Sequence, residues 1–190
     1  MKVSAILLAA GLSRRMGQDK LLLIYKEKSL LQHSIDLMVK LPVFERILVT
    51  SDARVEHLVL TPGIRLVVNP LPENGQSGSI HTGIKAATGS HYLFLAADQP
   101  RITSDDLKPL LETARANQDS IIVTTIDSKP NSPTLFPKRF RNDLLNLTGD
   151  TGGRIVRDAN RESCCSFEPV NPINFRDIDS AEDFYDIISC

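Results

Sequence analysis

The sequence has 190 residues, 42% of them hydrophobic, and a formal net charge of −1 at pH 7. Such a chain has the length of one domain and can bury a core. The balanced charge gives no reason to expect nucleic acid or an anionic membrane as a partner. No apolar stretch approaches the roughly twenty residues that cross a bilayer, and the N-terminus does not read as a secretion signal, so we expect a cytoplasmic protein.

Predicted strands and helices alternate along most of the chain. Apolar runs predict strands over 3–10, 46–50, 64–69, 92–96, 120–125 and 166–169. Ser29, Thr103 and Ser180 each precede a stretch with helical spacing and are expected to cap the helices that follow. This alternation indicates a single α/β domain, a Rossmann-like three-layer sandwich around a mostly parallel sheet.

The first predicted strand ends in a loop with glycines and positive charge. Residues 3–20 read VSAILLAAGLSRRMGQDK, so that Gly11 follows the strand and Arg14, Arg15 and Lys20 come next. A glycine here lets backbone N–H groups approach an anion closely. The spacing fits neither a Walker A loop nor the dinucleotide fingerprint G-x-G-x-x-G. We therefore expect a triphosphate cradle at the carboxyl end of this strand.

The predicted strand 92–96 is followed by Asp98, Gln99 and Pro100. Ligands of open α/β sheets bind outside the carboxyl ends of the strands, and Mg²⁺ prefers one or two carboxylates with waters and phosphate oxygens. By itself, an aspartate at this position could equally be a turn or capping residue. Together with the basic loop, it predicts a Mg²⁺ ligand.

The C-terminal third is divided into short elements by five prolines, at 130, 133, 137, 169 and 172. If a second ligand, an acceptor for a group of the triphosphate, binds to the chain, we expect it on these irregular segments, which a rigid sheet would hold in place. The odd number of cysteines, Cys164, Cys165 and Cys190, argues against a disulfide framework. Cys164 and Cys165 are expected in or beside a strand.

Residues 8–22, LAAGLSRRMGQDKLL, resemble the signature of the molybdopterin nucleotidyltransferases, a family with a glycosyltransferase-A-like fold. The double alanine before Gly11 is more similar to the cytidylyltransferase branch than to the guanylyltransferase branch. The resemblance implies catalytic roles for Arg15, Lys20 and Asp98. The residues that it implies for nucleotide binding in this segment are Leu8, Ala9, Ala10, Gly11, Arg15 and Lys20.

The stretch 69–83, NPLPENGQSGSIHTG, resembles a second family segment that contacts the nucleotide. It implies nucleotide-binding roles for Asn69, Gly75, Ser79 and Gly83. Without the resemblance, a loop that caps a helix would have a similar composition.

Two later segments match the family in part. Residues 177–183, DIDSAED, resemble a C-terminal segment of the family in which an acidic side chain adds a second metal contact. The resemblance makes both Asp177 and Asp179 candidates for this contact. The alternative is that they are turn residues before the last helix. Asn131-Ser132 stands where relatives carry Gly-His, although the stretch 147–154, LTGDTGGR, matches. This region is associated with the pterin acceptor in the family, so the identity of the acceptor stays open.

The resemblance implies a Mg²⁺-dependent nucleotidyltransferase over residues 1–190, with a nucleotide-binding half (1–100) and an acceptor-binding half (101–190). It would move a cytidylyl group from CTP onto molybdopterin cofactor and release pyrophosphate. One alternative is a sugar phosphate or another small phosphorylated acceptor. Another is a non-catalytic nucleotide-binding protein that serves the maturation of a molybdenum hydroxylase, with the hydroxylase or its maturation factors as partners. The sequence does not decide the nucleobase or the oligomeric state.

Overall fold

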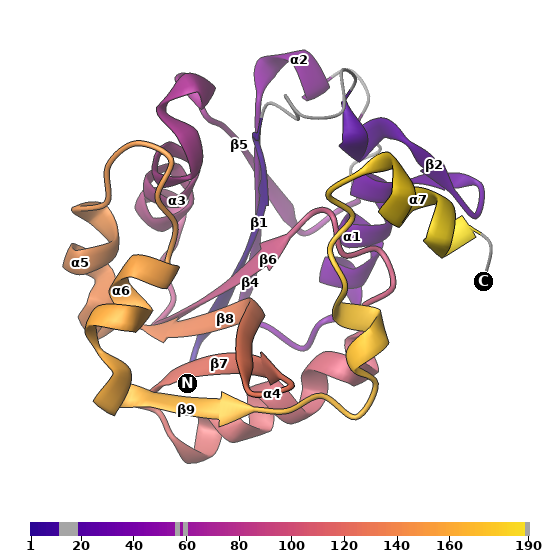
Figure 1. Cartoon of the computed structure of the whole chain (residues 1–190). Helices are drawn as coiled ribbons and strands as arrows, with labels where there is room; N and C mark the ends of the chain where they lie inside the picture. The colour runs from indigo at the N-terminus through magenta and orange to yellow at the C-terminus, as the bar shows by residue number, and fades with distance from the viewer. Residues whose placement is uncertain (12–18, 56–57, 59–60, 189–190) are drawn as a thin grey trace.

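The computed structural model describes residues 1–11, 19–55, 58 and 61–188, and these form one α/β domain (Figure 1). Its main sheet has seven strands in the order β5-β4-β1-β6-β8-β7-β9. Their bounds are β1 Val3–Ala9, β4 Glu45–Thr50, β5 Ile64–Val68, β6 His91–Ala96, β7 Ile121–Ile126, β8 Lys129–Pro137 and β9 Cys164–Phe167. All pairings are parallel except those of β8, which runs antiparallel to β6 and β7. The predicted fold class is confirmed.

Helices cover both faces of this sheet and make the three layers (Figure 1). Helices α1 and α4 pack on one face, and α3, α5 and α6 on the other. The helices are α1 Leu30–Lys40, α2 Asp52–Val55, α3 Gly75–Ala86, α4 Ser104–Ala116, α5 Arg141–Leu145, α6 Arg154–Ala159 and α7 Ala181–Ile188. A short hairpin of β2 (Ile24–Tyr25) and β3 (Lys28–Ser29) precedes α1. In the part of the chain described, no helix is long and apolar enough to span a bilayer.

The central position of β1 in the sheet explains why its sequence, VSAILLA, consists of small and apolar residues. Successive side chains of a strand point to opposite faces of the sheet. Ala5 and Leu7 therefore enter the core beneath α1 and α4, whereas Ile6 enters the core beneath α3. Both faces are buried, as expected for a strand between parallel neighbours.

The three predicted helix caps are confirmed. Ser29 Oγ accepts a hydrogen bond from the backbone N–H three residues on, at 3.1 Å. Thr103 and Asp106 form a reciprocal capping box at the start of α4, and Ser180 and Asp183 do the same at α7. These side chains satisfy N–H groups that a helix leaves unpaired in its first turn.

Strand β8 was not predicted from the sequence, which indicated only short elements between prolines. The strand follows β7 through a two-residue turn in which Asp127 and Ser128 have positive φ angles of 49° and 62°. Tight hairpins of this type usually carry Asn-Gly or Asp-Gly, so this sequence gives little turn signal. The last predicted strand was also misplaced: β9 begins two residues before 166–169, and the free thiols of Cys164 and Cys165 lie within it.

A register shift in β8 brings a loop-like segment to the carboxyl end of β6. Val123 pairs with Thr134, yet the next residue, Thr124, pairs with Asn131, so that Ser132 and its proline neighbour bulge from the ladder. Thr124 Oγ1 donates a hydrogen bond of 2.7 Å to the carbonyl of that proline and fixes the bulge. Bulges often redirect side chains beside functional sites.

Candidate active site

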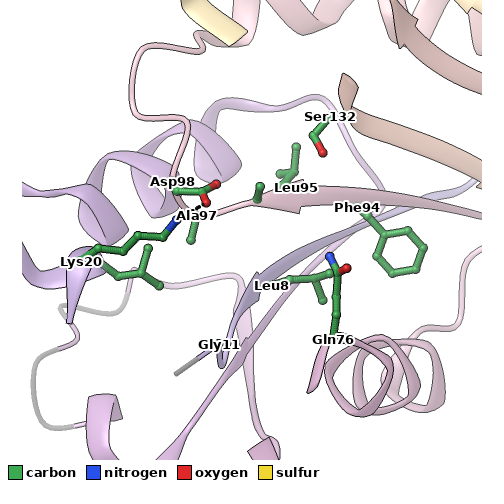
Figure 2. Close-up of a pocket in the computed structure, with 11 residues that line it drawn as sticks. Leu8, Gly11, Lys20, Gln76, Phe94, Leu95, Ala97, Asp98 and Ser132 are labelled. Atoms are coloured by element: carbon green, nitrogen blue, oxygen red, sulfur yellow. Dashed lines mark hydrogen bonds and ion pairs between the residues drawn. The ribbon is translucent and has the colours of Figure 1, made fainter. Parts of the chain in front are cut away.

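A lysine and an aspartate from distant parts of the sequence meet at the carboxyl ends of β1 and β6. Lys20 begins a 3₁₀ turn capped by Asp19, whose carboxylate accepts a hydrogen bond from Leu21 N–H at 3.1 Å. Lys20 Nζ donates to Asp98 Oδ2 at 2.7 Å, and Figure 2 shows the two side chains pointing toward one another. The structure thus brings together two of the three predicted catalytic residues. The third, Arg15, lies outside the described residues, as does Arg14.

The segment 177–179 closes over this ion pair. Lys20 Nζ also donates to the carbonyl of Ile178 at 2.8 Å and to Asp179 Oδ1 at 3.1 Å. The N–H of Ile178 donates in turn to the carbonyl of Asp98 at 3.0 Å. The lysine therefore links the end of β6 to the acidic segment that the sequence placed before the last helix.

Burial and neighbouring charge act on the pKa in opposite directions at Lys20 but in the same direction at Asp177. Burial of the Lys20 ammonium would lower its pKa, but the carboxylates of Asp98 and Asp179 outweigh that effect and raise the pKa. Burial, followed by the negative charges of Asp98 and Asp179, raises the pKa of Asp177 to about 7. These effects keep Lys20 charged, and Asp177 holds a proton to a higher pH than an isolated aspartate does.

One oxygen of this cluster is unsatisfied. Asp98 Oδ1 is buried and has no hydrogen-bond partner among the described residues. A buried carboxylate oxygen without a partner carries a desolvation cost that a cation would relieve. This atom therefore fits a divalent metal ion.

The carboxylates alone do not form a complete metal centre. Among the described residues, no group of three or more His, Cys, Asp or Glu side chains is arranged to hold a metal ion. Mg²⁺ usually keeps waters and takes phosphate oxygens beside one or two carboxylates. Asp98, with Asp177 or Asp179, therefore suits a metal ion that is also held by a phosphate.

Lys20 and Asp98 line a cavity of about 190 Å³ (Figure 2). Leu8, Gly11 and Lys20, three of the residues predicted to bind nucleotide, line it. Ala9 and Ala10 are buried in the two cores, at 0% and 1% exposure, and line neither cavity, so their side chains are not available to a ligand.

The four predicted residues of the second segment line neither of the two cavities described here. Asn69 and Ser79 are buried, and Asn69 Nδ2 donates to Ser79 Oγ at 3.3 Å, which ties the end of β5 to α3. A Cβ atom on Gly83 would stand 2.5 Å from Ile6 Cγ2, so this glycine allows α3 to lie close to the sheet. For these three residues, packing explains the sequence pattern without a ligand.

Gly75 begins α3 at the point where the stretch 69–83 contacts the stretch 147–154. Its φ angle is +72°, and a Cβ atom there would lie 2.6 Å from the backbone of Asp150. Gln76 N–H donates to Asp150 Oδ1 at 3.2 Å, and Ser77 Oγ donates to the carbonyl of Gly149 at 2.7 Å. The stretch 147–154 is therefore held against the start of α3, and Gly75 permits the close approach.

A family model described as a MobA-like NTP transferase domain matches residues 5–164. The chain belongs to this family. A molybdenum cofactor guanylyltransferase from Syntrophotalea carbinolica is 34% identical over 121 residues, which are 64% of this chain and 56% of that protein. A probable molybdenum cofactor guanylyltransferase from Methanothermobacter thermautotrophicus is 31% identical over 62% of this chain and 60% of its own length. The chain thus spans little more than half the length of these curated relatives.

Solved structures share the whole fold. Rv0371c from Mycobacterium tuberculosis superposes with a TM-score of 0.84 at 20% identity, covering 100% of this chain and 98% of that one. A nucleotidyl transferase from Methanothermobacter thermautotrophicus gives 0.83 at 23% identity, covering 99% and 96%. At these identities the comparisons establish the fold of this MobA-like domain.

Sequence reasoning missed several residues of the site. Gln76, Phe94 and Ser132 line the smaller cavity and also a larger one of about 620 Å³, which Arg154 and Arg157 reach from α6. Gln76, Ser132 and Arg154 lie inside segments that the sequence had marked, so a signal was present. The place of Ser132 in the cavity wall could not be predicted, because it depends on the bulge in the unpredicted strand β8.

Gln99 is a further residue whose role the sequence did not indicate. Its side chain is 2% exposed, and its Nε2 donates to the carbonyl of Phe175 at 2.9 Å. The same nitrogen lies 3.4 Å from the carbonyl of Ser132 and from Asn131 Oδ1. Gln99 therefore joins the end of β6 to the bulge of β8 and to the turn that precedes Asp177.

Proposed function

We propose that the chain transfers a nucleoside monophosphate from a nucleoside triphosphate to a molybdopterin-type acceptor and releases pyrophosphate. The observation that carries this proposal is the pairing of Lys20 with Asp98 beside Gly11, in a cavity at the carboxyl ends of β1 and β6. The MobA-like family and curated relatives named molybdenum cofactor guanylyltransferase support the reaction class and the acceptor. The cytoplasm is the expected location.

In this reaction, a phosphate oxygen of the acceptor attacks the α-phosphorus in line. A new P–O bond forms, the bond from the α-phosphorus to the bridging oxygen breaks, and pyrophosphate leaves with that oxygen. The acceptor phosphate is already ionised, so no strong general base is needed, and positioning and charge neutralisation supply most of the catalysis.

Each group of the site then has a defined task. Lys20 and Arg15 neutralise the β- and γ-phosphates and the departing pyrophosphate, and Gly11 offers its backbone N–H to the phosphates. Asp98, with Asp177 or Asp179, would hold a divalent ion, which neutralises charge on the phosphate oxygens when bound. A complex of the Mycobacterium tuberculosis neighbour with manganese supports a divalent ion, and we propose Mg²⁺ for this chain.

The larger cavity is the proposed acceptor site. It shares Leu8, Gln76, Phe94 and Ser132 with the smaller cavity, so a bound acceptor would lie directly beside the nucleotide. Its remaining lining comes mainly from residues 130–157. This arrangement supports a nucleotide-binding half over 1–100 and an acceptor-binding half over 101–190.

The donor base is proposed as cytosine, on the resemblance of Ala9-Ala10 to the cytidylyltransferase branch. The names of the curated relatives favour guanine instead. Pyrophosphate release from each of the four ribonucleoside triphosphates, with Mg²⁺ and with or without molybdenum cofactor, separates these donors. We expect release from CTP only when the cofactor is present, and release from GTP alone would move the donor to guanine.

The same assay tests the other acceptors. Pyrophosphate release with a sugar phosphate, but not with molybdenum cofactor, would replace the proposed acceptor. Tight triphosphate binding without release for any acceptor would favour a non-catalytic role in molybdenum hydroxylase maturation.

A further inference from the structure

The Lys20 ammonium uses all of its hydrogen-bonding capacity inside the protein. An ammonium group has three N–H donors. Those of Lys20 go to Asp98 Oδ2, the carbonyl of Ile178 and Asp179 Oδ1, at 2.7, 2.8 and 3.1 Å. In this conformation Lys20 has no donor left for a triphosphate.

Two of these three acceptors belong to Asp98 and Asp179, carboxylates that are proposed to hold the metal ion. Lys20 and Asp98 are largely shielded from water, with side-chain exposures of 17% and 20%. Two cations that share carboxylates in such a setting repel each other, because the surroundings screen their charges less than water does. Lys20 bound in this way therefore opposes a divalent ion at Asp98.

We propose that Lys20 is the resident cation of the Asp98–Asp179 cluster, and that it leaves this place only when a nucleotide brings its own metal ion. The proposal rests on the proposed function and adds an order of binding to it. Without nucleotide, Lys20 neutralises the carboxylates and holds segment 177–179 against β6. With nucleotide, the triphosphate offers the ammonium new oxygen acceptors and releases Asp98 to the accompanying cation.

This order of binding follows because the carboxylates alone supply too few oxygen ligands for a metal ion. The carboxylates suit a metal ion that phosphate oxygens also hold, so a free metal ion gains little from the site. A free ion would also have to displace Lys20 from three hydrogen bonds. A metal–triphosphate complex supplies both the missing oxygen ligands and the replacement partners for Lys20. The lysine thus couples metal loading to nucleotide binding.

The test is a Mn²⁺ titration of the nucleotide-free protein, followed by electron paramagnetic resonance. Lys20→Met removes the charge at nearly constant length, and Lys20→Gln serves as a second neutral variant. Both are expected to bind Mn²⁺ about tenfold more tightly than the wild type, because a competing positive charge is lost. Lys28→Met is the matched control, since Lys28 forms an ion pair with Asp36 away from the site, and its Mn²⁺ affinity should stay at the wild-type value.

A further variant confirms the location. Adding Asp98→Asn to Lys20→Met should abolish the gain in Mn²⁺ affinity, and a gain that persists would contradict the proposal. Equal or weaker Mn²⁺ binding by both neutral variants, with circular dichroism spectra like that of the wild type, would overturn it. The titration contains no nucleotide, so this result is distinct from a failure of the proposed function, which would appear as no pyrophosphate release.

Discussion

Gly83→Ala separates a packing role from a ligand role at a position that the family resemblance marked for nucleotide binding. Gly83 lies within α3 on the sheet side, and an added Cβ would meet Ile6 Cγ2 at 2.5 Å and Val49 Cγ2 at 3.2 Å. Ile6 and Val49 are both 0% exposed, so neither side chain can swing into solvent. The helix must shift away from the sheet, or Ile6 must leave its preferred rotamer.

The expected cost follows from two opposing effects. Overpacking of a core by one methyl-sized group costs about 1–3 kcal/mol, while replacing glycine by alanine inside a helix gains about 1 kcal/mol. Gly78→Ala, in the same helix, is the matched control. The nearest atoms that an added Cβ at Gly78 would meet are 3.4 Å away, which is ordinary van der Waals contact. The control should gain stability, and Gly83→Ala should be about 1–3 kcal/mol less stable than the control.

Urea unfolding followed by circular dichroism measures both variants. If Gly83→Ala is as stable as Gly78→Ala, the packing argument is wrong. If Gly83→Ala keeps its stability but loses triphosphate affinity, the ligand role implied by the sequence is right instead.

Three more predictions concern the site, the residue that supports it, and a partly buried carboxylate at the start of β4. Asp98→Asn should lower pyrophosphate release by about a hundredfold or more with an unchanged circular dichroism spectrum, since loss of one charge-stabilising group costs roughly 3 kcal/mol; near-normal release would refute the metal role. Gln99→Leu leaves the buried carbonyl of Phe175 without its donor and should lower the free energy of unfolding by about 1–3 kcal/mol; urea unfolding at wild-type stability would show that this link is dispensable. For Glu45, burial raises the pKa, but hydrogen bonds from Ser4 and from the segment before β6 outweigh it and hold the pKa below its usual 4.5. The ionised Glu45 therefore stabilises the folded state above pH 4.5, and this contribution is lost as the pH falls through the lower, folded-state pKa. In urea titrations at acid pH, the difference in free energy of unfolding between the wild type and Glu45→Gln should shrink.

The first half of the fold could be predicted because its signals are local. An apolar run such as that of β1 needs only two buried faces, and a cap such as Ser29 acts on a backbone group three residues away. The meeting of Lys20 and Asp98 was also foreseeable, since parallel strands place their carboxyl ends at one edge of the sheet.

The second half depends on contacts that the sequence does not signal. Strand β8 exists because β6 and β7 pair with it, and its turn at Asp127 and Ser128 carries no glycine. The position of Ser132 follows from the bulge in that strand, so the wall shared by the two cavities was missed. Gly83 shows a different limit: a motif marks a position as constrained without saying whether a ligand or the neighbouring sheet constrains it.

The central claim is that the chain transfers a nucleotidyl group, and isotope tracing tests it most directly. The protein is incubated with Mg²⁺, molybdenum cofactor and either α-³²P- or γ-³²P-labelled CTP or GTP, and the products are separated. The account predicts that the α-label appears in a product joined to the cofactor, while the γ-label leaves in pyrophosphate. A γ-label in the cofactor product, or in inorganic phosphate without any joined product, would contradict it.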